Sequence, residues 1–176
     1  MSRKLALFIA ASVDGYIAGP NDDLSFLSVV EQEGEDYGYA EFTKDVDTVI
    51  LGRKTYDKVM SMGIQFPYAD KKTYIITRTP QPTQGLINFY TGDLKTLVDE
   101  LKQQDGKTIF CDGGAQVIHL LLQHNLIDEI TLSVIPVLLG DGIRLFNNGF
   151  NMQRLSLISA NSYPKGLVQM HYKLLK

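Results

Sequence analysis

A glycine, two cations and a hydroxyl side chain follow one another at Gly52, Arg53, Lys54 and Thr55. The apolar run before them predicts a buried strand, and the residues after them have a helical pattern. A helix that begins at a strand's carboxyl end presents free backbone N–H groups and its positive dipole end to an anion. Gly52 allows close approach of the backbone, and Arg53 and Thr55 can bind phosphate oxygens. The segment predicts a phosphate-binding loop, although an ordinary strand–turn–helix with two solvated cations fits the spacing equally well.

A second strand that ends in glycines lies further along the chain, in Thr108-Ile-Phe-Cys-Asp-Gly-Gly-Ala-Gln-Val117. In open α/β sheets the ligand crevice lies beyond the carboxyl ends of the strands, so the two loops together could hold separate parts of a dinucleotide. Alternatively, the glycines serve a tight turn that needs a positive φ. Neither loop has the G-x-G-x-x-G spacing, which excludes the usual dinucleotide-binding fingerprint.

The composition is that of a globular protein. The chain has 176 residues, of which 44% are hydrophobic and 21% are charged, and we expect one domain over residues 1–176. Its net charge is -3 and its cations are scattered, so no nucleic-acid partner is expected. Cys111 is the only cysteine, which excludes an intrachain disulfide and a Cys-rich zinc site. His119 and His124 are five residues apart and do not share a helix face, so no metal site is expected.

An apolar run of seven residues, from Leu5 to Ala11, lies near the amino end. It leads into turn residues at Asp14 and Gly15, which predicts a first central strand rather than a secretory signal. No other segment approaches the length of a membrane span. We therefore expect a cytoplasmic protein, and the single cysteine agrees with a reducing compartment.

The apolar pattern predicts an α/β fold in which helices connect mainly parallel strands. The last two strands alternate in polarity and resemble an antiparallel hairpin at the edge of the sheet. Strands are expected at residues 5–11, 48–51, 72–77, 87–90, 107–112, 129–136, 155–160 and 167–174, and helices at 35–44, 53–62, 94–104 and 115–124.

Four motifs, taken together, are specific to one protein family. They are Ser12-Val-Asp-Gly-Tyr-Ile-Ala18, Val49-Ile-Leu-Gly-Arg-Lys-Thr-Tyr56, Asp112-Gly-Gly-Ala115 and the segment from Asp128 to Phe146. Over almost its whole length the chain resembles the dihydrofolate reductase-like reductases, and within them the carboxyl-terminal reductase domain of bifunctional riboflavin biosynthesis proteins, the RibD C-terminal domain. The fourth motif points to this riboflavin-type branch rather than to dihydrofolate reductase itself. The chain also has no tryptophan, and Ser25 and Phe26 stand where a folate enzyme has one beside the pterin.

The resemblance implies a three-layer sandwich with an eight-stranded, mainly parallel sheet, a homodimer and NADPH as the cofactor. It places Ala10 and Ile17 beside the nicotinamide and Thr77 and Arg78 at the adenosine 2′-phosphate. A cationic partner for that phosphate would favour NADPH over NADH, although a solvated loop cation is an equally good interpretation of Arg78. The two glycine loops then supply the remaining cofactor contacts, which are Gly52, Arg53, Lys54, Thr55, Gly113, Gly114, Ala115, Gln116 and Val117.

Candidates for the proton donor and for substrate contacts are less well marked. Asp36 precedes Gly52 by the same offset as the substrate-binding acid of dihydrofolate reductases, but a solvated, acid-rich helix face is the favoured interpretation. The resemblance also places Asp141 and Arg144 near the substrate, where a glycine turn that returns the chain to the core is the alternative.

Together with the two glycine loops, the resemblance implies an NADPH-dependent reductase of a small polar substrate, similar to 5-amino-6-(5-phosphoribosylamino)uracil reductase. Two alternatives remain open. The first is dihydrofolate reductase activity, and the second is a nucleotide-binding protein without turnover. In each case the expected ligands are small molecules.

Overall fold

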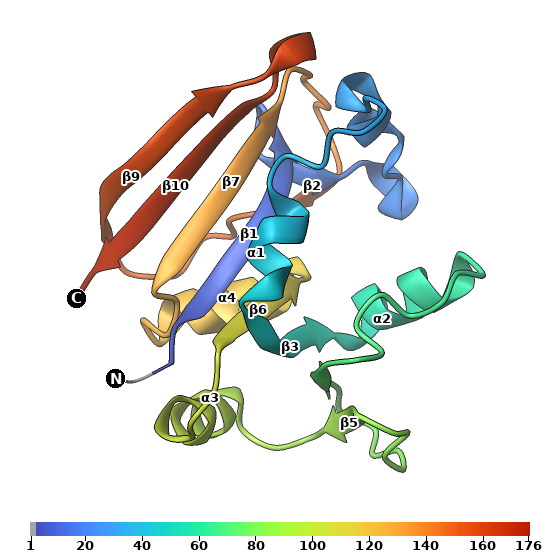
Figure 1. Cartoon of the computed structure of the whole chain (residues 1–176), viewed down its shortest axis with the longest axis vertical. Helices are drawn as coiled ribbons and strands as arrows, with labels where there is room; N and C mark the ends of the chain where they lie inside the picture. Colours follow the sequence, from blue (N-terminus) through green and yellow to red (C-terminus); the bar gives the residue numbers. More distant parts are fainter. Residues whose placement is uncertain (1–2) are drawn as a thin grey trace.

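The computed structural model describes residues 3–176, which form a central eight-stranded sheet in the order β5-β4-β3-β6-β1-β7-β10-β9 (Figure 1). Neighbouring strands from β5 to β7 run parallel, and β10 joins antiparallel to both β7 and β9. The predicted α/β fold, with its antiparallel edge hairpin, is therefore confirmed. The strands of this sheet are β1 (Leu5–Ser12), β3 (Val46–Gly52), β4 (Lys72–Ile76), β5 (Ile87–Tyr90), β6 (Thr108–Gly113), β7 (Glu129–Ile135), β9 (Arg154–Ser162) and β10 (Val168–Leu175).

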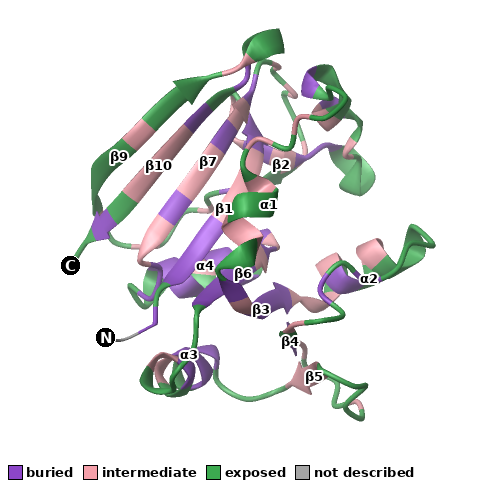
Figure 2. Cartoon of the chain, in the orientation of Figure 1, coloured by how far each residue is buried: buried purple, intermediate pink, exposed green. Residues whose placement is uncertain are grey.

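Helices cover both faces of the sheet. Helix α1 (Tyr39–Lys44) crosses in front of β1 and β6 in Figure 1, and α4 (Ala115–Gln123) lies behind them. Helix α2 (Arg53–Ser61) packs on the same face as α1, around Phe110, whereas α3 (Leu94–Gln103) packs with α4 around Leu7 and Ile118. Figure 2 shows that β1, β3, β6 and α4 are rich in buried residues, so the core lies against the central strands on both faces of the sheet.

The helix expected at residues 35–44 begins four residues later, at Tyr39. The carboxylate of Asp36 accepts hydrogen bonds from the backbone N–H groups of Gly38 and Ala40, at 2.9 and 2.8 Å. Gly38 itself has a φ of +81°, which an α-helix does not accommodate. The segment before Tyr39 is therefore a turn fixed by Asp36, and the predicted amino end of this helix was wrong.

Several short elements have no counterpart in the sequence prediction. Strands β2 (Tyr16–Ala18) and β8 (Ile143–Arg144) form a separate two-stranded sheet. Three short 3-10 segments are η1 (Pro20–Asp22), η2 (Ser25–Val30) and η3 (Pro164–Gly166). Segments of two to six residues are too short to show a hydrophobic period, so the sequence pattern could not reveal them.

Candidate functional site

The first glycine loop lies where β3 ends and α2 begins. A Cβ atom added to Gly52 would lie 3.3 Å from Cγ2 of Val117 and 3.6 Å from the backbone nitrogen of Gly114. A Cβ added to Gly114 would lie 3.0 Å from Oγ1 of Thr55. The two glycine loops, far apart in the sequence, are therefore in contact, and side chains at these positions would occupy the space between them.

The second glycine loop contains a turn that needs glycine, which was the alternative interpretation of its sequence. Gly113, the last residue of β6, has a φ of +107°, so the turn does need glycine there. The peptide bond between Gly113 and Gly114 is cis. Helix α4 begins immediately afterwards at Ala115 and directs Val117 toward the first loop, while Gln116 is exposed. The turn thus places one helix amino terminus beside that of α2, at the carboxyl edge of β3 and β6.

The guanidinium of Arg53 extends from this edge toward the β4–β5 connection. Its Nε donates to the two carboxylate oxygens of Asp57 at 2.7 and 2.9 Å, and it lies 5.7 Å from the centre of the Phe89 ring. Turning the Gln81 amide brings that side-chain oxygen within 2.6 Å of Nη1. The same connection carries Arg78, which is exposed, so the two predicted cations flank one loop. Lys54 is exposed on the first turn of α2. Thr77 follows the last residue of β4, and its hydroxyl is bonded to the backbone of Thr79.

Ile17, predicted beside the nicotinamide, and Arg144, predicted beside the substrate, lie on the paired strands β2 and β8. Tyr16 pairs with Arg144, whose guanidinium lies 5.0 Å above the tyrosine ring, and Ile17 is the next residue of β2. Asp14 holds the segment that precedes β8, because its carboxylate accepts hydrogen bonds from the backbone nitrogens of residues 139 and 140 at 3.1 and 2.7 Å. A hydrogen bond from the Ser12 hydroxyl, together with these two, lowers the pKa of Asp14 to about 2. Asp141 accepts from the backbone nitrogen of its own neighbour, residue 142.

A cavity of about 330 Å³ opens on the α1 face of the sheet, beside Ala10. Its walls are mainly apolar, and the Ser133 hydroxyl, which accepts from Gln169 at 3.0 Å, supplies a buried polar group. Asp36 lies at the exposed rim with its carboxylate engaged as the cap of α1. The cavity is lined by Phe8, Ile9, Ala10, Leu27, Val30, Glu31, Glu35, Asp36, Tyr37, Tyr39, Ser133, Ile135 and Leu167.

The acid that precedes the double glycine, Asp112, received no role in the sequence prediction. It is partly buried on β6, and this burial raises the pKa of its carboxyl to about 7, while the Tyr68 phenol acts in the opposite direction. Strand alternation places Asp112 on the same face as Phe110, which contacts Tyr39 of the cavity wall. An acid followed by two glycines could have been recognised as a candidate, but its environment depends on residues distant in the sequence.

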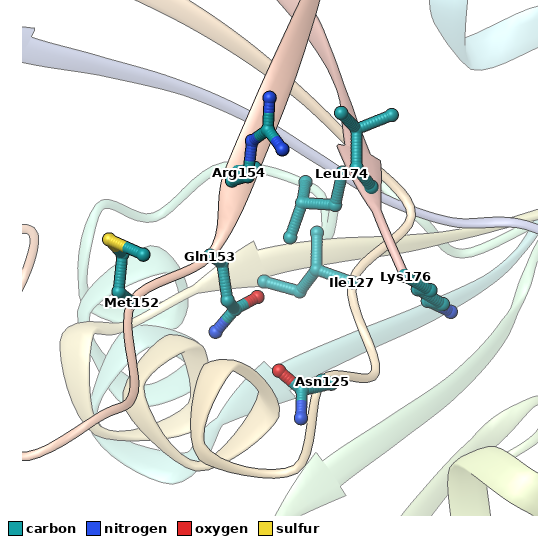
Figure 3. Close-up of a pocket in the computed structure, with 8 residues that line it drawn as sticks. Asn125, Ile127, Met152, Gln153, Arg154, Leu174 and Lys176 are labelled. Atoms are coloured by element: carbon teal, nitrogen blue, oxygen red, sulfur yellow. The ribbon is translucent and has the colours of Figure 1, made fainter.

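A larger hollow, of about 610 Å³, lies at the opposite end of the sheet (Figure 3). It is bounded by the start of β9, the end of β10 and the turn after α4, where Asn125, Gln153 and Arg154 supply polar groups. None of the residues predicted for the site lines it. Ligands of open α/β sheets bind at the carboxyl ends of parallel strands, and this hollow lies near the amino end of β7.

The fold and the paired glycine loops define a dihydrofolate reductase-like α/β protein. An Enterococcus faecalis dihydrofolate reductase, solved in complex with NADP(H), superposes with a TM-score of 0.66 over the whole of both chains at 14% identity, a likeness of fold alone. The family model described as RibD C-terminal domain matches residues 3–169. The chain therefore belongs to this reductase-like family.

Two other proteins are more similar in sequence than this dihydrofolate reductase and cover nearly all of the chain or all of it. The uncharacterized protein YwjB of Bacillus subtilis (strain 168) is 39% identical over 173 residues, which is 98% of each chain. A crystal structure of a Shewanella sp. PV-4 protein assigned to riboflavin biosynthesis has a TM-score of 0.89 and 29% identity, and each chain is covered completely.

The helices in the described part of the chain are short. The longest, α3, has ten residues, and none of those between residues 3 and 176 has the length and apolar character that crossing a membrane requires.

Proposed function

We propose that this protein is an NADPH-dependent reductase of a small polar substrate, with an activity similar to that of 5-amino-6-(5-phosphoribosylamino)uracil reductase. The contact between the two glycine loops is the observation that carries the proposal. A Cβ on Gly52 or Gly114 would press against the other loop, so glycine at both positions lets the amino ends of α2 and α4 lie close together. Two adjacent helix amino termini suit the phosphates of a dinucleotide.

The proposed cofactor contacts follow from this arrangement. Thr55 and the backbone N–H groups of both helix ends bind the pyrophosphate, and Arg53 and Arg78 bind the 2′-phosphate beside the β4–β5 connection. Ala10 and Ile17 bound the nicotinamide end, next to the 330 Å³ cavity that receives the substrate. When bound, NADPH supplies the hydride, and the protein contributes position and electrostatics.

The chain must also provide a proton if the substrate is reduced at a polar double bond. We propose Asp112 for this task, because a carboxyl whose pKa is raised to about 7 keeps part of its population protonated at neutral pH. Asp36 remains the second candidate, since it lines the cavity. Its two carboxylate oxygens already accept hydrogen bonds from Gly38, just before α1, and from Ala40 in its first turn, which favours a structural role.

Titration of the purified protein with NADPH and NADH, followed by nucleotide fluorescence, tests the cofactor assignment. We expect NADPH to bind more tightly, and Arg78→Ala to weaken NADPH about tenfold with little effect on NADH, since one charge-assisted hydrogen bond is lost. Arg53→Ala should weaken NADPH as well. Lys95→Ala, which removes an exposed cation from α3, is the matched control.

Two results would count against the proposal. If neither nucleotide binds, the glycine loops serve only the architecture of the sheet. If NADPH binds but is not consumed with any of a panel of heterocyclic and carbonyl acceptors, a nucleotide-binding protein without turnover is the better description. In the second case, Asp112→Asn should leave nucleotide binding unchanged.

A further inference from the structure

Two tyrosines lie between the substrate cavity and Asp112. Tyr39, the first residue of α1, lines the cavity, and Tyr68 comes from the connection between α2 and β4. Their hydroxyl oxygens are 2.9 Å apart, so one phenol donates a hydrogen bond to the other. Tyr68 in turn interacts with the carboxyl of Asp112. The cavity wall, the two phenols and the acid therefore follow one another in space.

Aromatic packing holds both phenols in place. The rings of Tyr39 and Tyr68 meet Phe110 edge-on, with centroid separations of 6.3 and 5.9 Å. Phe66 makes a similar contact with Tyr68 at 5.4 Å. Because Phe110 lies two residues before Asp112 on β6, the strand that carries the acid also fixes the two rings. The arrangement of the three polar groups is thus set by the core rather than by a mobile loop.

The two phenols can each pass on a proton and still be neutral at rest. Burial raises the pKa of Tyr39, and burial together with the nearby Asp112 raises that of Tyr68, so both remain protonated at neutral pH. Cys111, the other titratable group that interacts with Asp112, is a buried thiol whose pKa is raised to about 12. A phenol can donate one hydrogen bond and accept others. Tyr68 can therefore donate to Asp112 when the carboxylate is charged. When the carboxyl is protonated, Tyr68 can accept from it and donate to Tyr39, which is the direction toward the cavity.

We propose that Tyr68 is a positioning residue for Asp112, and that the Tyr39–Tyr68 pair is a path along which the proton of this carboxyl reaches the substrate cavity. The inference deepens the proposed reductase function and depends on it for its role in turnover. Bound NADPH would supply the hydride, and the reduced substrate would then carry a basic atom. That atom takes the Tyr39 proton, Tyr39 takes the Tyr68 proton, and Tyr68 takes the Asp112 proton. The resulting carboxylate regains a proton from water.

The test follows the titration of Asp112 itself and needs no substrate. Protein labelled with carbon-13 at the aspartate carboxyls is titrated by NMR, and Asp112→Asn identifies the signal. Tyr68→Phe keeps the ring and removes the donor that favours the charged carboxylate, so the Asp112 midpoint should rise by about one pH unit. Tyr39→Phe should raise the Asp112 midpoint by less, because this substitution affects Asp112 only indirectly, by making Tyr68 a weaker donor. Tyr56→Phe, in the same aromatic cluster, is the control.

An unchanged Asp112 midpoint in Tyr68→Phe would overturn the positioning role, and an unchanged midpoint in Tyr39→Phe would remove the path to the cavity. Should Tyr68→Phe not fold, Tyr39→Phe still decides whether the two groups are coupled. NADPH titration of the wild-type protein reports separately on the proposed function. A shifted midpoint without nucleotide binding would therefore preserve the coupling and refute the reductase, and the reverse result would refute the coupling alone.

Discussion

Asp112 has surroundings that disfavour its charge, and this has a consequence for stability. Burial raises the pKa of its carboxyl from 3.8 to about 7. Between these values the folded protein binds more protons at this site than the unfolded chain does. The stability of the fold therefore falls as the pH rises through this window. An acid with a raised pKa is a liability for folding, which is what one expects of a residue kept for chemistry.

We predict that Asp112→Asn removes this dependence. The free energy of unfolding, measured by urea denaturation from pH 4 to pH 8, should decline less steeply in the variant than in the wild type. From the change in pKa the difference should be on the order of 2–4 kcal/mol at pH 8. Asp105→Asn, at an exposed acid, should run parallel to the wild type. Parallel curves for Asp112→Asn would show that the carboxyl ionises normally in the folded protein.

At the scale of elements, the turn after β1 and the segment around residues 137–145 act as one unit. The carboxylate of Asp14 accepts from the backbone nitrogens of Leu139 and Gly140, and the nitrogen of Leu145 donates to the carbonyl of Gly15 at 2.9 Å. A Cβ on Gly142 would lie 2.1 Å from the carbonyl oxygen of Ala18, so the two segments touch there. The predicted nicotinamide and substrate contacts are held together by these bonds.

We predict that Asp14→Ala loosens this unit. Hydrogen–deuterium exchange should accelerate at least about tenfold at the amides of Leu139 and Gly140, because both lose their acceptor. Since the pKa of Asp14 is lowered to about 2, the bonds should persist in the wild type at every pH well above that value and weaken only as the pH falls through it. Asp141→Ala removes a purely local bond and serves as the control. Unchanged exchange in Asp14→Ala would mean that other contacts fix the segment.

What the sequence could predict depends on how local the cause is. The strand at residues 87–90 and the start of α2 at Arg53 agree with the sequence pattern, because hydrophobic periodicity and glycine punctuation are local signals. The start of α1 could not be found in this way, because Asp36 caps it through side-chain geometry. The role of Asp112 was hidden for another reason. Its environment is set by Tyr68 and Phe110, and tertiary packing brings these together.

At the scale of the whole molecule, the edge of the sheet at β9 is unprotected. All but one of its nine residues are exposed, and Figure 2 shows the strand almost entirely in the colour of exposed residues. Within the described chain β9 pairs only with β10, which leaves the backbone groups of its outer side without strand partners. Leu155, Leu157 and Ile158 add apolar side chains, and Leu157 is 55% exposed. Such an edge is a template for another strand.

The homodimer expected from the family resemblance would cover this edge, and we predict that a second copy of the chain packs there. Light scattering after size exclusion should give the mass of a dimer for the wild type, because an interface of more than about 1,000 Å² needs an extended apolar surface of this kind. Leu157→Lys places a charge in that surface and should shift the protein toward monomer. Met62→Lys, which alters an exposed apolar residue just after α2, should remain dimeric. A dimer that tolerates Leu157→Lys would have to use another face, and a wild-type monomer at micromolar concentration would contradict the prediction outright.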